Sequence, residues 1–87
     1  MTSYYYVYVI RSQKDMMFYT GYTSNLRSRL EEHNKGFVNA TKRRIPFVLV
    51  YWEGCRHRQD ATRREKYLKS SWGKRYLKSR LRNYLTG

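Results

Sequence analysis

The chain has 87 residues, enough for one small domain with a modest hydrophobic core. Its 19 lysines and arginines against six acidic residues give a formal net charge of +13, which indicates a polyanionic partner such as nucleic acid. No segment approaches the roughly 18 apolar residues of a membrane-spanning helix, and no signal-peptide pattern opens the chain. Because the single cysteine, Cys55, cannot form an internal disulfide, we expect a cytoplasmic protein.

Three strands are predicted. Aromatic and β-branched residues favour strands at Tyr4–Ile10 and Met17–Thr23, joined as a hairpin by a polar turn at Ser12–Asp15. A third run, Phe47–Trp52, is apolar without alternation. Strands of this kind are covered on both faces, so we expect this one at the centre of the sheet.

The first helix is predicted to follow the hairpin. It should run from about Asn25 to Asn34, with Thr23 or Ser24 as its cap, and end near Gly36. A loop, Phe37–Arg44, then carries three consecutive cations.

The C-terminal part reads as helical from Arg58, with a break near Gly73. A final helix carries leucines at i, i+4 and i+8, namely Leu77, Leu81 and Leu85. The order β-β-α-β-α-α predicts an α/β (α+β) fold, in which helices flank a small, mainly antiparallel three-stranded sheet. The whole chain, residues 1–87, is expected to form one domain.

Ionisable residues fall on the helix faces that should look inward. The first helix places Leu26, Leu30, His33 and Phe37 on one stripe, with Arg29 at its edge. In the second helix Glu65 lies within the stripe of Ala61, Leu68 and Trp72. Burial of such groups is costly unless they are paired. They form either structural ion pairs or a concave site, and their convergence on a tyrosine-rich hairpin favours the site.

The tyrosine motifs resemble those of the GIY-YIG nucleases. Tyr6-Val7-Tyr8 followed by Tyr19-Thr20-Gly21 is similar to the paired family motifs, and Asn25 to Asn34 looks like the first family helix. Ala61 to Glu65 resembles the segment that holds the metal-binding glutamate. The similarity covers nearly all of the chain and is greatest to the short, stand-alone branch related to the N-terminal nuclease domain of the excision-repair endonuclease.

The resemblance implies a role for each matching residue. Tyr8 and Tyr19 would flank the attacking water, one of them as general base or its relay. Arg29 would hold the scissile phosphate, His33 would assist proton transfer, and Glu65 would bind one divalent cation, Mg²⁺ or Mn²⁺. A single carboxylate is compatible with one Mg²⁺, which keeps several waters and takes further ligands from substrate phosphate.

Four positions depart from the family pattern. Tyr6 stands where glycine is usual, Thr20 where isoleucine is usual, and Tyr22 where the repair enzyme has lysine. The asparagine found in many members has only Asn83 as a weak counterpart. These departures bear on the efficiency of cleavage more than on the fold.

Further cations are candidates for contacts with the nucleic-acid backbone. They lie in the loop before the third strand and on the second helix: Lys42, Arg43, Arg44, Arg63, Arg64, Lys66 and Lys69. Charge runs are usually solvated, but beside the hairpin these residues would suit phosphate contacts without base reading.

The pattern thus predicts a structure-selective or weakly specific DNA endonuclease, in repair or recombination, with a partner protein for targeting. The alternative is a non-catalytic DNA- or RNA-binding module on the same fold. A structural protein-interaction domain fits the charge least well.

Overall fold

Three antiparallel strands form the centre of the computed structural model, which describes residues 3–87. β1 (Tyr5–Ser12) lies between β2 (Phe18–Thr23) and β3 (Phe47–Cys55), so the order across the sheet is β2-β1-β3. Both pairings are antiparallel, and β1 and β2 form the predicted hairpin.

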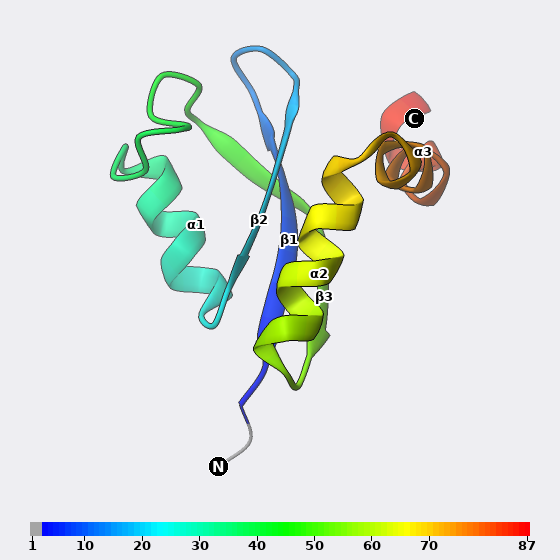
Figure 1. The fold of residues 1–87 in the computed structure, drawn as a ribbon. Helices are drawn as coiled ribbons and strands as arrows, with labels where there is room; N and C mark the ends of the chain where they lie inside the picture. Colours follow the sequence, from blue (N-terminus) through cyan, green and yellow to red (C-terminus); the bar gives the residue numbers. More distant parts are fainter. Residues whose placement is uncertain (1–2) are drawn as a thin grey trace.

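The helices cover both sides of this sheet. α1 (Leu26–Asn34) lies on one side and α2 (Arg58–Lys69) on the other (Figure 1). α3 (Ser71–Arg80) and the short α4 (Arg82–Thr86) follow. The order β-β-α-β-α-α, with one extra C-terminal turn of helix, confirms the predicted α+β class. Among residues 3–87, no helix has the length and apolar character needed to cross a membrane.

The prediction that the third strand is central was wrong. The central strand is β1, in which Val7 to Ile10 are all buried. β3 is an edge strand, with Val48 and Trp52 exposed. β3 does not alternate because a bulge interrupts its period-two pattern. The bulge is seen as a register shift opposite Val9 and Ile10 of β1.

The helix boundaries correct several sequence-based expectations. The cap of α1 is Asn25, whose side chain accepts a hydrogen bond from the Ser28 amide, rather than Thr23 or Ser24. Phe37 and Trp72 are 72% and 68% exposed, since each lies beyond the end of the helix whose inward stripe it was predicted to join.

The break after α2 falls at Ser70 rather than at Gly73. The Ser70 hydroxyl accepts a hydrogen bond from the Gly73 amide and so caps α3. Gly73 itself is buried in the first turn of α3, where a side chain would collide with the backbone of Leu68. The expected final helix is also divided, because α3 ends at Arg80 and Leu81 joins it to α4.

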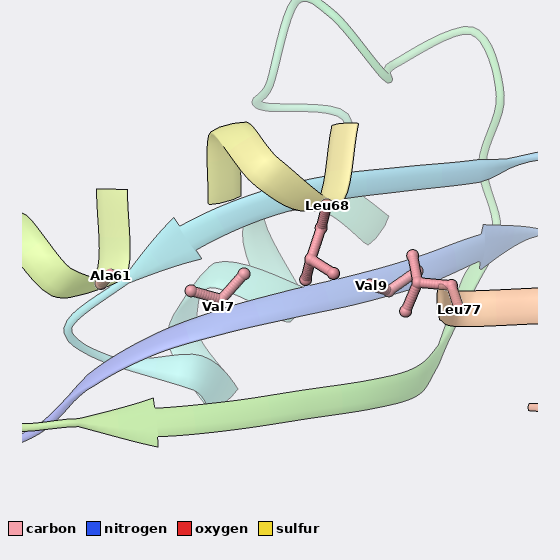
Figure 2. Close-up of a cluster of buried hydrophobic side chains, with 5 residues drawn as sticks. All are labelled: Val7, Val9, Ala61, Leu68 and Leu77. Atoms are coloured by element: carbon pink, nitrogen blue, oxygen red, sulfur yellow. The ribbon is translucent and has the colours of Figure 1, made fainter. Parts of the chain in front are cut away.

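The buried cluster on the α2 side of the sheet is formed by apolar residues. Val7 and Val9 of β1 pack against Ala61 and Leu68 of α2 and Leu77 of α3 (Figure 2). All five side chains are at most 2% exposed. This cluster attaches α2 and α3 to the sheet and thereby positions Glu65, which lies between Ala61 and Leu68 on α2.

Candidate active site

Tyr8 lies on the opposite face of β1, beneath α1. It pairs across the sheet with Gly21 of β2, and its phenol ring extends over that glycine. A Cβ atom at position 21 would stand 2.5 Å from the Tyr8 hydroxyl oxygen and 2.7 Å from Cζ. The glycine of the Tyr19-Thr20-Gly21 motif is therefore required by the ring of Tyr8.

A hydrogen-bonded chain holds the Tyr8 hydroxyl in place. Its oxygen lies 2.8 Å from Nε2 of the fully buried His33, whose Nδ1 lies 2.7 Å from the Thr41 hydroxyl. The Thr41 hydroxyl in turn donates to the Val38 carbonyl at 3.5 Å. Thr41 must then accept from Nδ1–H, which leaves Nε2 to accept from the Tyr8 hydroxyl.

Burial keeps both members of this pair neutral at pH 7. Burial, together with the positive charge of Arg29 and against the opposing charge of Glu32, lowers the pKa of His33 to about 4. Burial also raises the pKa of Tyr8, although the nearby Arg29 opposes that shift. The imidazole is therefore an acceptor that aligns the phenol.

Tyr19 approaches the same imidazole from β2. Its ring centroid lies 5.2 Å from that of His33, in an edge-on arrangement, and the corresponding distance for Tyr8 is 5.6 Å. Tyr19 is half-buried, whereas Tyr8 is only 2% exposed. It also lines a cavity of about 680 Å³ with Lys69 of α2. Of the two phenols, Tyr19 is the more exposed.

Arg29 extends from α1 toward Tyr8 and remains accessible. Its guanidinium donates to Glu32 at 2.9 Å, and its side chain is 36% exposed. Exposed pairs of this kind contribute only about 0–1 kcal/mol, so an incoming phosphate can displace Glu32. Arg29 also lines a second cavity, of about 380 Å³.

Glu65 belongs to α2, on the side of the sheet opposite α1 (Figure 1). Its side chain is 20% exposed and forms an ion pair with Lys69 at 2.9 Å. Burial is the largest cause of the raised pKa of Tyr8, and the negative charge of Glu65 adds to it. Among residues 3–87, no three histidine, cysteine or acidic side chains are grouped closely enough to hold a metal ion by themselves.

The candidate backbone-binding cations of the loop adjoin the tip of the hairpin. Lys42 and Arg43 are exposed, while Arg44 forms an ion pair with Asp15 at 2.7 Å. Three further hydrogen bonds join the same two segments: Ser12 Oγ to the Arg44 carbonyl, the Gln13 amide to the Pro46 carbonyl, and Lys14 Nζ to the Arg43 carbonyl. We call this set of contacts the tip clasp.

The candidate cations of α2 differ in their availability. Lys66 is exposed, and Arg63 forms an exposed ion pair with Asp60 at 2.7 Å. Arg64 instead donates to both carboxylate oxygens of Glu53 at 2.9–3.1 Å and lies over the rings of Tyr67 and Tyr76. These contacts give Arg64 a structural function in holding the helices against β3.

Sequence reasoning missed two residues that shape the site. Thr41 fixes the orientation of His33, and Arg58 of α2 lines the cavity that contains Arg29. Neither stands out in the sequence, because Thr41 belongs to an irregular loop and Arg58 is one of 19 basic residues. Thr41 lies beyond the end of α1, so helical periodicity does not connect it with His33.

Fold and sequence together define a nuclease-type domain. The family model for the GIY-YIG catalytic domain matches residues 4–80, and the chain therefore belongs to the GIY-YIG family. This confirms the resemblance drawn from the tyrosine motifs.

The similar proteins belong to the group named UPF0213. One from Staphylococcus haemolyticus is 43% identical over 67 residues, which cover 76% of this chain and 80% of the relative. Another, from Clostridium perfringens, is 42% identical over 65 residues, covering 74% and 69%. The solution NMR structure of a UPF0213 protein from Bacillus halodurans has a TM-score of 0.54 and 33% identity, covering 87% of this chain and 83% of that one.

Proposed function

We propose that the protein is a metal-dependent endonuclease that hydrolyses phosphodiester bonds in DNA, with structural selectivity or weak sequence preference. A function in DNA repair or recombination is part of this proposal. The observation that carries it is the Tyr8–His33–Thr41 chain, with Tyr19 and Arg29 beside it. Two phenols, a fixed imidazole and an accessible guanidinium supply the groups that hydrolysis of a phosphodiester needs.

In the proposed reaction, a water oxygen attacks phosphorus as the bond from phosphorus to the leaving oxygen breaks. Tyr19, the more accessible phenol, acts as the phenolate: it orients this water, receives its proton and becomes the neutral phenol, while the leaving oxygen takes a proton from solvent. Tyr8 is held by His33 and forms the wall of the water site. Arg29 exchanges Glu32 for the scissile phosphate, since its planar fork can donate to two oxygens.

A divalent cation fits the donor set only with help from the substrate. Glu65 offers one carboxylate, and Lys69 would have to release it. Mg²⁺ or Mn²⁺ bound there would neutralise charge on the phosphate and favour the phenolate form of a nearby tyrosine. Waters and phosphate oxygens would complete the ligand set.

Substitution of Arg29 provides the main test. Arg29→Ala should reduce nicking of labelled duplex, nicked, flapped and single-stranded DNA by roughly 100-fold or more, because it removes charge stabilisation of the transition state. Affinity should fall much less, since many other cations remain. The matched control is Arg27→Ala, which removes the same charge from an exposed position on the same helix. Equal effects of the two substitutions on cleavage would contradict the assignment.

The metal requirement is tested separately. EDTA should abolish cleavage, and Glu65→Gln, which keeps the shape of the side chain, should reduce it strongly at fixed Mg²⁺ or Mn²⁺. Cleavage by Glu65→Gln at the wild-type rate would overturn the metal site at Glu65.

One observation favours the second candidate, a DNA- or RNA-binding module without turnover. Glu65, the only carboxylate we assign to the metal, is already paired with Lys69. Salt-dependent DNA binding without cleavage in either Mg²⁺ or Mn²⁺ would support this candidate over the nuclease.

A further inference from the structure

The cavity of about 380 Å³ beside Arg29 contains a second arginine. Arg29 and Glu32 line it from α1, Tyr22 from β2, and Arg58 from the first position of α2. The cavity lies where three elements meet, at the end of β2 from which the chain enters α1. Two guanidinium groups on one polar cavity are suited to an anionic ligand.

The position of Arg58 has no explanation in the stability of the fold. It forms no ion pair among residues 3–87, because the nearby Asp60 pairs with Arg63. A cation at the start of a helix also opposes the helix dipole. Its one aromatic contact, 5.7 Å from the Tyr5 ring centroid, leaves the side chain exposed.

Arg58 is aligned with the proposed catalytic groups. It precedes Glu65 by seven residues, which is about two helical turns, so both lie on one face of α2 about 10 Å apart along the axis. Arg29 lines the cavity with Arg58. The charges of Arg29 and Glu65 both affect the pKa of Tyr8, Arg29 lowering it and Glu65 raising it. A DNA strand that passes Glu65 and Arg29 would thus bring its next phosphate to Arg58.

We infer that Arg58 is a positioning residue that binds the backbone phosphate next to the scissile one. This inference rests on the proposed nuclease function. The β2 residue at this cavity, Tyr22, is uncharged. The second cation, beside Arg29, is therefore Arg58 of α2. Holding the neighbouring phosphate fixes the position of the reacting one, and small displacements there reduce rates strongly.

The test compares Arg58→Ala with Arg56→Ala. Arg56 is a close match, since it is also exposed and lies 5.5 Å from a tyrosine ring, that of Tyr4, but it does not line the cavity. Arg58→Ala should lower kcat/KM on the best DNA of the nicking panel by roughly 10- to 100-fold, the effect of a lost charged hydrogen bond. In EDTA, the slope of log affinity against log salt should fall by about 0.7–0.9, which corresponds to one phosphate contact.

The decisive control restores a positive charge to the cavity by a substitution in β2. Adding Tyr22→Lys to Arg58→Ala places an ammonium group on the same cavity and should restore at least part of the lost kcat/KM and salt slope. Circular dichroism checks that each variant folds. If the wild type cleaves DNA but Arg58→Ala behaves like Arg56→Ala, the inference fails and the nuclease proposal stands. If the wild type does not cleave, the nuclease proposal fails, and an unchanged salt slope in Arg58→Ala then also removes the phosphate contact.

Discussion

The two faces of the sheet are built by opposite rules. On the α2 face, Val7 and Val9 form a buried cluster with the apolar residues Ala61, Leu68 and Leu77 (Figure 2). On the α1 face, alternate residues of the same strand, Tyr8 and Ile10, share a layer with the buried His33. One strand thus supplies stability on one side and chemistry on the other, because successive side chains of a strand point to opposite faces.

The polar face is fully hydrogen-bonded. Among residues 3–87, every buried side-chain nitrogen and oxygen has a partner. Such networks give a defined geometry at little net gain in stability, since each bond replaces one to water. We therefore expect substitutions on the α2 face to affect folding most, and those on the α1 face to affect function most.

The largest expected effect is on the apolar face. Leu68→Ala should lower the free energy of unfolding by about 2–5 kcal/mol, because Leu68 is almost fully buried and its loss leaves a cavity. Tyr8→Phe keeps the ring and should cost about 1–3 kcal/mol, because the buried His33 loses its partner, while it reduces cleavage. Urea unfolding of the two variants measures the difference. Similar losses of stability would show that the two faces are not distinct.

The second prediction uses pH to separate the faces. His33 has a folded pKa of about 4 against 6.5 in the unfolded chain, so the unfolded state binds more protons between these values. The stabilising contribution of neutral His33 is complete above pH 6.5 and is lost as the pH falls toward 4, by at most about 3 kcal/mol. Unfolding curves at pH 7 and pH 4.5 measure it. His33→Gln should lack this part of the pH dependence, and an unchanged dependence in that variant would contradict the assignment.

The third prediction concerns the contact between the two motif tyrosine segments. Gly21→Ala should cost about 1–3 kcal/mol and displace the Tyr8 ring, because the added methyl group overlaps the phenol. In a Tyr8→Ala background the same substitution should be nearly neutral. A double-mutant cycle measures this coupling, and additive effects would mean that the ring does not enforce the glycine.

Much of the fold followed from periodicity, while the orientation of the site did not. The hairpin, α1 and the inward position of Leu68 could be predicted because period and propensity agree there. The central strand was misassigned because an apolar run does not reveal whether a strand lies at the centre or at the edge of a sheet. The bulge also removes the alternation of β3. His33 could be placed on an inward face, but its partner Thr41 depends on how an irregular loop folds back.

The tip clasp makes the hairpin and the loop before β3 a single mechanical unit. Lys42 and Arg43 are thereby carried at a constant separation from Tyr8 and Tyr19, which belong to the same hairpin. A ligand that contacts both regions therefore has to match this spacing. Lengthening the loop would change this spacing without altering Tyr8 or Tyr19.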